Sequence, residues 1–364
     1  MRKFYEEDYR LEYKSTFIPR SKHVLRGGRV ALDRFERIKA LLTPSSRVLD
    51  VGSGGGEFAY LLKSLGHEVV GVEPNRGYAG FSREQYGLEV RVGFLGDVQF
   101  PAESFDLITI WHVLEHMEDP SAVLRQLRGA LRPGGRLVVE VPNVEAICQS
   151  PRSSFHEAHL YTFSPVTLDR LAANSALEQV QSRLSADGGN ITMVFAPVAG
   201  CTVQAVALRI PGNHARVAGI VNGHTKWSHA LSPHPWRRAA CRLQRMASES
   251  WGVRHGTKGR ALLDALYLKH LRPDRARPAV LRRLVWVWLL AAYALAVAAE
   301  EVFLDQVWSA VQFAPAEGLA AYMGLQALVI GALFWAFGRN LESPRDLFKA
   351  GAWAVPLLAV PAVF

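Results

Sequence analysis

Short apolar runs recur through the first two hundred residues, and helical patterns separate most of them. Strands that alternate with helices are typical of a mostly parallel sheet with helices on both faces, so the pattern predicts an α/β, doubly wound fold. A capped helix that starts near Ser164 and two further strands complete this part by about residue 200. The first five strands are expected at about 47–51, 68–72, 89–92, 105–110 and 136–141.

The segments on either side of this alternating part differ from it. Residues 1–46 predict a helical N-terminal arm, because apolar residues recur at helical spacing up to Thr43-Pro44. Residues 201–283 predict a linker that is partly helical and partly irregular, with a basic amphipathic helix at 236–252 and a possible extra strand at 202–210. Residues 47–200 are left as the main domain.

Residues 284–364 are predicted to form hydrophobic helices. The segment 284–299 is uncharged, and 318–338 is long enough to span a hydrocarbon core, which takes about 20 residues. Basic residues precede the first segment and follow the second, whereas acidic residues lie between them. The positive-inside rule then predicts a multi-pass transmembrane anchor, with the main domain at the cytoplasmic face of the membrane. The alternative is a pair of buried helices in a soluble helical domain.

A glycine-rich turn follows the first predicted strand, in the sequence DVGSGGG at residues 50–56. A dinucleotide fingerprint would require a third glycine where Glu57 stands. Asp50, directly before the turn, suits a ligand that carries ammonium and sulfonium charge better than a pyrophosphate. Glu73 ends the next strand about twenty residues later, where a carboxylate can accept both hydroxyls of a ribose. The alternative is a tight turn without a ligand.

The net charge of +9 comes from one part of the chain. Residues 201–283 contain 16 Lys and Arg against 3 Asp and Glu, so the remainder is net acidic at about −4. Such a segment can bind nucleic acid or an anionic membrane surface, or can simply be solvated. The apolar segments that follow favour the membrane surface, and no nucleic-acid-binding module is recognisable. The three cysteines form no C-x-x-C pair, which is typical of a reduced cytoplasmic setting.

Two later stretches, GDVQFPAESFDLITIWHVLEHMEDP and LRGALRPGGRLVVEVPN, complete a recognisable series of motifs. With the glycine turn, they closely resemble the class I S-adenosylmethionine-dependent methyltransferases, in particular the small-molecule and ubiquinone-biosynthesis members. The resemblance covers about residues 30–200. It implies a Rossmann-like sheet of seven strands, mostly parallel with the last one antiparallel, and S-adenosylmethionine as the methyl donor.

The resemblance also implies the roles of individual residues. Gly52 and Gly54 would lie against the methionine and ribose part of the donor, and Glu73 would bind the ribose hydroxyls. Asp97 would meet the adenine amino group, and Trp111 would begin the wall that faces the methyl group. The full set of predicted cofactor-binding residues is Asp50, Gly52, Ser53, Gly54, Glu73, Asp97 and Trp111.

Methyl transfer from a sulfonium needs alignment, exclusion of water and, for a hydroxyl or amine acceptor, a group that removes a proton. His112, Glu115 and His116 have i, i+3, i+4 spacing, so a helix would place them on one face. His116 is the first candidate for an acid/base or orienting role, with His112 second; the alternative is a capping or core histidine. His159 with Tyr161 is a candidate for the acceptor pocket, or a surface loop.

Some relatives bind a divalent metal here through two glutamates and histidines. His112 stands where the first glutamate would be, so no metal is predicted. The leading hypothesis is methyl transfer to a hydroxyl or amine of a small-molecule, lipid or lipid-linked acceptor at the cytoplasmic membrane face. The first rival is an RNA or DNA methyltransferase, although the amino-methylase motif is absent after the fourth strand. The second rival is a non-catalytic S-adenosylmethionine-binding sensor or scaffold.

Overall fold

The computed structural model describes residues 18–153, 155–198, 209–253 and 259–271. The chain divides into two units, 1–271 and 272–364, and every described residue belongs to the first. The predicted membrane anchor and almost all of the possible strand at 202–210 therefore lie outside the described residues. Among the helices that the structure describes, none combines the length and apolar character that a membrane crossing requires.

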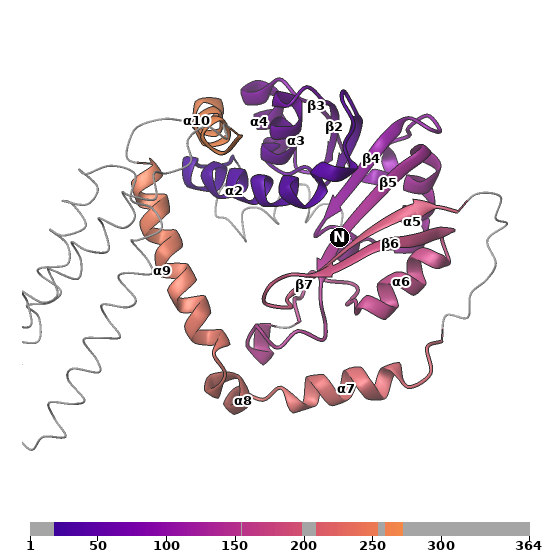
Figure 1. Ribbon diagram of the computed structural model, residues 1–364, viewed down its shortest axis with the longest axis vertical. Helices are drawn as coiled ribbons and strands as arrows, with labels where there is room; N and C mark the ends of the chain where they lie inside the picture. The colour runs from indigo at the N-terminus through magenta and orange to yellow at the C-terminus, as the bar shows by residue number, and fades with distance from the viewer. Residues whose placement is uncertain (1–17, 154, 199–208, 254–258, 272–364) are drawn as a thin grey trace, which may run out of the picture. The chain divides into compact units, whose positions relative to one another are not determined.

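A seven-stranded sheet forms the centre of the first unit (Figure 1). The strand order is β3-β2-β1-β4-β5-β7-β6; the pairings from β3 through β5 are parallel, and β7 is antiparallel to both β5 and β6. The predicted α/β class and the predicted sheet of seven mostly parallel strands are thus confirmed. The strands are β1 (Arg47–Val51), β2 (Glu68–Glu73), β3 (Glu89–Val92), β4 (Phe105–Trp111), β5 (Leu131–Pro142), β6 (Leu177–Leu184) and β7 (Asn190–Pro197).

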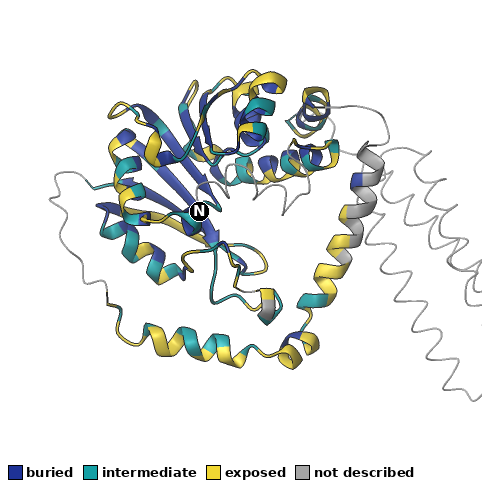
Figure 2. Cartoon of the chain, turned by 180° about the vertical axis from the view of Figure 1, so that it is seen from behind, coloured by how far each residue is buried: buried dark blue, intermediate teal, exposed yellow. Residues whose placement is uncertain are grey.

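Helices cover both faces of this sheet, because successive residues of the inner strands point to opposite sides. Val48 packs toward α2, α3, α4 and α10, whereas Leu49 packs toward α5 and α6. Figure 2 shows the inner strands as a buried layer between partly exposed helices, whereas β6, at the edge of the sheet, is mostly exposed. The helices are α2 (Ser21–Ile38), α3 (Glu57–Ser64), α4 (Arg76–Tyr86), α5 (Pro120–Ala130), α6 (Pro165–Ala173), α7 (Asn213–Gly223), α8 (Lys226–Leu231), α9 (His234–Val253) and α10 (Arg260–Leu271).

Local sequence signals explain where several helices begin. The Asp119 side chain accepts the backbone N–H of Ala122 at 2.8 Å and caps α5, with Pro120 at the first helical position. Ser164 and Thr167 form a reciprocal capping box at the start of α6, as the capped-helix prediction expected. The amphipathic helix expected at 236–252 is present as α9.

The N-terminal helix α2 is held from its outer side by the last described helices. Gly28 lies so close to α10 that an added Cβ would be 2.6 Å from a methyl carbon of Leu263. Arg26 binds Glu249 of α9 through two hydrogen bonds, both of 2.8 Å. Part of the segment that the sequence indicated as a linker thus packs on the main domain.

Candidate functional site

A cavity of about 650 Å³ opens at the carboxyl ends of β1, β2 and β4, beneath α2. In open α/β sheets this edge is where ligands bind, and a volume of this order accommodates a nucleoside-sized molecule. The wall combines α2, the glycine turn, the ends of β2 and β4 and the segment that follows β4. Lining residues that the following paragraphs use are Arg26, Arg34, Gly52, Ser53, Gly54, Glu73, Trp111, His112, Val113 and His116.

The glycine turn needs glycine for two physical reasons. Gly52 has a φ of +72°, and an added Cβ would lie 2.3 Å from a methyl carbon of Val113. Gly54 also has a positive φ, of +57°. Side chains are strained in this backbone region, so the turn lets a ligand and the 112–117 segment approach the backbone closely.

Glu73, at the tip of β2, is almost fully buried and bonds to the glycine turn itself. One carboxylate oxygen accepts the backbone N–H of Gly54 at 2.8 Å, and the other accepts that of Asn75 at 3.1 Å. Glu73 also lines the cavity, where a carboxylate can accept hydroxyl groups. The ribose-binding role given to Glu73 stays a prediction.

Asp50 is buried behind the turn and is absent from the cavity lining. Its carboxylate accepts the Thr109 hydroxyl at 2.8 Å. Burial raises the pKa of Asp50 to about 6, although the Thr109 hydrogen bond and the nearby Arg34 act in the opposite direction. Asp50 thus joins β1 to β4 through Thr109, and its burial disfavours the ionised form of the carboxyl group.

Trp111 and Arg34 form the part of the wall between the turn and α2. The Arg34 guanidinium carbon lies 4.7 Å from the centre of the Trp111 ring. Among the described residues, neither the Arg34 Nε nor the Trp111 Nε1 has a hydrogen-bond partner. Burial lowers the pKa of Arg34, while Asp50 and Glu140 raise it. The sequence analysis included Trp111 among the site residues but missed Arg34. In the sequence, Arg34 is one of several arginines in the predicted helical arm, and nothing distinguishes it from the others.

Asp97 lies at the edge of the site. It ends a short 3-10 turn at Leu95–Asp97 and is exposed to solvent. Gly93, Phe94 and Leu95 line the cavity, whereas Asp97 does not. The adenine-binding role given to Asp97 stays a prediction.

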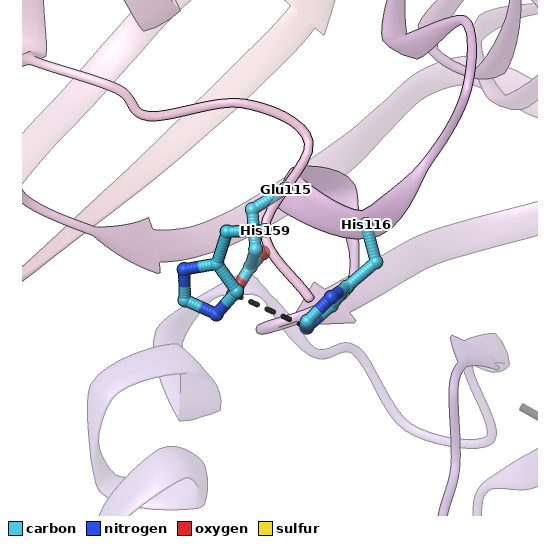
Figure 3. Close-up of side chains that lie close together, drawn as sticks. All are labelled: Glu115, His116 and His159. Carbon is cyan, nitrogen blue, oxygen red and sulfur yellow. Dashed lines mark ion pairs between the residues drawn. The ribbon is translucent and has the colours of Figure 1, made fainter. Parts of the chain in front are cut away.

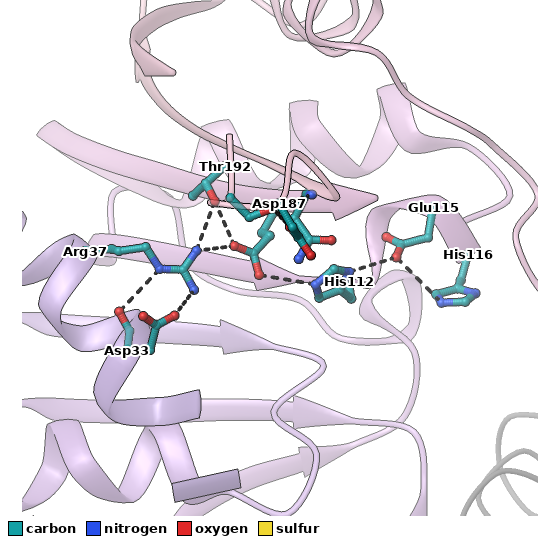
Figure 4. A network of polar contacts seen from close by, with 10 residues as sticks. Asp33, Arg37, His112, Glu115, His116, Asp187 and Thr192 are labelled. Carbon is teal, nitrogen blue, oxygen red and sulfur yellow. Dashed lines mark hydrogen bonds and ion pairs between the residues drawn. The ribbon is translucent and has the colours of Figure 1, made fainter. Parts of the chain in front are cut away.

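The predicted helix face of His112, Glu115 and His116 is wrong. His112 has a φ of +54° directly after β4, and Leu114–His116 form one 3-10 turn, because α5 begins only at its Asp119 cap. The side chains nevertheless converge. The Glu115 Oε1 atom lies 3.5 Å from His112 Nδ1 and 4.0 Å from His116 Nε2 (Figure 4).

A second carboxylate, Glu140 on β5, approaches the other nitrogen of His112, at 3.2 Å. Burial would lower the pKa of His112, but Glu115 and Glu140 outweigh it and raise the pKa to about 9. Burial would raise the pKa of Glu140, but His112, Thr192 and Arg37 lower it to about 2. His112 is thus a cation at neutral pH, and it cannot remove a proton from an acceptor in that form.

His116 has a different set of contacts. Its Nδ1 bonds the Ala158 carbonyl oxygen at 2.8 Å; a carbonyl only accepts, so Nδ1 carries a proton. In the neutral imidazole, Nε2 is then the acceptor atom. Backbone N–H groups of Leu160 and Tyr161 donate to the Glu115 carbonyl, which brings His159 against His116. Burial lowers the pKa of His159 to about 4. The His159 ring contacts that of His116, with centroids 4.8 Å apart, but His159 is absent from the cavity lining, whereas His116 is part of it. The roles given to His116 and His159 stay predictions.

Glu115, His116 and His159 could also hold a divalent cation, although the sequence analysis predicted none. One potential ligand atom from each lies within 4.8 Å of the others, as Figure 3 illustrates. Glu115 is 1% exposed, and neither carboxylate oxygen receives a hydrogen bond from a described residue. A buried carboxylate in this state suits a cationic ligand or a donating hydroxyl. Tyr161 is different: it is exposed, and its hydroxyl donates to the Glu118 carbonyl.

Comparison with known proteins identifies the domain. Residues 23–182, which is less than half of the chain, match the family model of a methyltransferase domain. The chain is similar to a ubiquinone biosynthesis O-methyltransferase of Xanthomonas axonopodis pv. citri (strain 306), with 35% identity over 117 residues, 30% of this chain and 49% of that protein. It is also similar to phosphoethanolamine N-methyltransferase 3 of Arabidopsis thaliana, with 29% identity over 163 residues, 42% of this chain and 32% of that protein.

A third relative has a different printed name. The tRNA U34 carboxymethyltransferase of Methylococcus capsulatus (strain ATCC 33009 / NCIMB 11132 / Bath) is 35% identical over 127 residues, 31% of this chain and 37% of that protein. The chain thus spans between about a third and a half of the length of these three curated relatives. The predictions of a methyltransferase and of S-adenosylmethionine as methyl donor are confirmed for this domain.

Proposed function

We propose that the chain transfers a methyl group from S-adenosylmethionine to a hydroxyl or amine of a small-molecule, lipid or lipid-linked acceptor at the cytoplasmic membrane face. The observation that carries the proposal is one cavity whose wall has two chemically different parts. Glu73 and the glycine turn line the part suited to a nucleoside, and His112 and His116 line the part suited to an acceptor.

The donor part of the cavity has groups that suit S-adenosylmethionine. Glu73 would accept the ribose hydroxyls, and the backbone of Gly52 and Gly54, which lines the cavity, would lie against the ligand. Arg34, with a buried Nε that lacks a hydrogen-bond partner among the described residues, would bind the carboxylate of the methionine part. Bound there, S-adenosylmethionine supplies a methyl carbon already activated by the sulfonium charge.

At the acceptor end, the proton of a hydroxyl or amine must leave as the bond to carbon forms. In its neutral form, His116 would accept this proton at Nε2, because its Nδ1 bonds the Ala158 carbonyl oxygen. His112 is a cation held between Glu115 and Glu140, so its role is to set the charge and the position of Glu115. Trp111, buried beside them, excludes water from this part of the wall.

The acceptor class and the membrane location rest on the sequence and on two relatives. The uncharged segment 284–299 and the apolar segment 318–338 favour an enzyme that works on a membrane-confined pool. The relatives are named for ubiquinone biosynthesis and for phosphoethanolamine, and both names describe transfer to small acceptors.

Calorimetric titration with S-adenosylmethionine tests the donor site. Glu73→Ala is expected to weaken binding by about tenfold to a hundredfold, because a charged hydrogen-bond acceptor contributes about 1.5–3 kcal/mol. The matched control is Glu68→Ala on the same strand, where the side chain is exposed and should leave the heat unchanged. Absence of heat with the wild-type chain, or equal binding by the two variants, contradicts the proposal.

An RNA acceptor is the second candidate, since one relative is named for tRNA and residues 201–283 are basic. Incubation of the protein with labelled donor and fractionated cell extract separates the candidates. Label in the lipid fraction supports the proposal, and label in nuclease-sensitive material supports RNA. If donor binds but no fraction is labelled, the non-catalytic sensor becomes the better description.

A further inference from the structure

Residues 226–242, which we call the basic-apolar segment, expose large apolar side chains beside cations. Trp227 and Leu231 lie four positions apart on α8 and so share one side of that helix. Trp236 follows in the first turn of α9. Their exposed fractions are 80%, 87% and 73%, whereas no other large apolar side chain among the described residues exceeds 56%. Three such side chains within ten residues of sequence, together called the patch below, require an explanation.

The charges around this patch have one sign. From residue 209 to residue 248 the sequence contains seven Lys and Arg and no Asp or Glu. Lys226, Arg237, Arg238 and Arg242 are exposed, and within the described part of the chain none of these four forms an ion pair. The positive potential of the basic-apolar segment therefore remains available to a partner.

We propose that the basic-apolar segment is an in-plane docking element for an anionic lipid surface, with Trp227, Leu231 and Trp236 inserted among the headgroups and the neighbouring cations against them. Trp and Leu gain from burial at the boundary between headgroups and acyl chains, and each nearby cation adds attraction to anionic lipid. Because cations alternate with these apolar side chains, the segment suits a position along the lipid surface.

The aliphatic member of the patch favours lipid over single-stranded nucleic acid. Nucleic acid would engage the cations and could stack bases on Trp227 and Trp236. Leu231, the most exposed large apolar side chain of the described residues, has no aromatic face for stacking and no donor for a phosphate. Only an apolar phase gives all three side chains a favourable environment.

The docking element is mechanically connected to the cavity. Helix α9 runs from the exposed Trp236 to Glu249, a rise of about 20 Å at 1.5 Å per residue. The Glu249 carboxylate holds Arg26 of the cavity wall through two hydrogen bonds. A lipid surface that binds one end of α9 thus lies at a set distance from the site. The inference stands independently of the proposed methyl transfer, because lipid docking and donor binding are measured separately.

A local probe tests the proposal in the full-length protein. Ala230→Cys places a thiol beside Leu231 at an exposed position, with Cys201→Ser and Cys241→Ser to remove other reactive thiols; Cys148 is buried and can stay. An environment-sensitive fluorophore on residue 230 is titrated with phosphatidylcholine vesicles, with and without phosphatidylglycerol. We expect a blue shift with the anionic vesicles that high salt reverses.

Two sets of substitutions separate the apolar and the ionic parts. Replacing Trp227, Leu231 and Trp236 together by Ser should weaken the vesicle affinity seen by the probe by about tenfold or more. Replacing Lys226, Arg237 and Arg238 together by Gln should weaken affinity for the anionic vesicles by a similar factor. The matched control, Val180→Ser with Leu184→Ser on the exposed strand β6, should leave it unchanged. Equal heats of donor binding show that each variant is folded.

Each contrary result has a defined meaning. An unchanged emission with anionic vesicles overturns the proposal, and so does an equal affinity of the Ser-substituted protein. A blue shift that a single-stranded RNA oligonucleotide produces and vesicles do not would instead assign the segment to nucleic acid. Attachment through a distant part of the chain would persist in the Ser-substituted protein, so loss of the blue shift in that protein identifies contact by the segment itself.

Discussion

Asp50 provides a sharp thermodynamic test of the site, because its buried carboxylate is held at a cost to folding. Its pKa is about 6 in the folded chain against 3.8 for a solvated aspartate. The folded state therefore binds the proton more tightly, and the contribution of Asp50 to stability falls as the pH rises from about 4 to about 6. Asp50→Asn removes the charge and retains an acceptor for the Thr109 hydroxyl.

The magnitude follows from the two pKa values. One pKa unit corresponds to about 1.36 kcal/mol, so the raised pKa of Asp50 lowers the free energy of unfolding by about 3 kcal/mol at pH 7.5 and by about 1 kcal/mol at pH 4.5. These are upper values for the gain in Asp50→Asn, since an amide is not identical to a protonated acid. For a domain of about 200 residues, we expect the Tm to rise by about 6–12 °C at pH 7.5 and by about 2–4 °C at pH 4.5.

The assay is thermal unfolding of the wild type and of Asp50→Asn at pH 7.5 and pH 4.5. The Tm difference between the two proteins at each pH isolates the effect of Asp50, because the other titrating groups are present in both. Asp106→Asn is the matched control of opposite sign. Burial alone would raise the pKa of Asp106, but the Arg47 backbone and Arg132 lower it, so this variant should be less stable at pH 7.5. A Tm of Asp50→Asn below that of the wild type at pH 7.5, or a difference independent of pH, would refute the reasoning.

The glycine turn and the cavity wall yield two further predictions. Gly52→Ala is expected to lower the free energy of unfolding by about 1–3 kcal/mol in chemical denaturation, because the new Cβ clashes with Val113 and the residue has a positive φ. Adding Val113→Ala should relieve the clash and restore part of this loss, whereas the backbone strain remains. Full recovery, or none, would show that only one of the two causes operates. Arg34→Met, which keeps contact with Trp111, should weaken S-adenosylmethionine binding by about tenfold or more and leave binding of 5′-methylthioadenosine, which lacks the carboxylate, unchanged. Equal losses for both ligands would remove Arg34 from carboxylate binding.

Local sequence signals predicted the strands and the glycine turn, because period-two apolar runs and adjacent glycines are properties of neighbouring residues. Glu73 was found for the same reason, as the last residue of such a run. The helix expected through His112 and His116 was wrong because i, i+3, i+4 spacing cannot distinguish a helix from one 3-10 turn. The cap at Asp119 and Pro120 decides the start of α5, and the structure shows that it acts there.

Partners that are distant in sequence could not be found from spacing. Glu140 meets Arg37 across 103 positions, and Arg26 meets Glu249 across 223. Both contacts exist because the strand order and the position of α2 bring those elements together. The protonated state of His112 follows from such contacts, so its role could not be inferred from the WHVLEH motif alone.

The two ends of the described chain meet at α2, and this has a consequence for synthesis on the ribosome. The sheet between residues 47 and 197 has its own buried layers, so it can begin to fold once β7 has emerged. Helix α2 is made earlier, yet its outer side is covered by α9 and α10, which end at residue 271. Among the described helices, the first to leave the ribosome is thus covered only when the last two have been made, and a nascent chain should acquire donor affinity late.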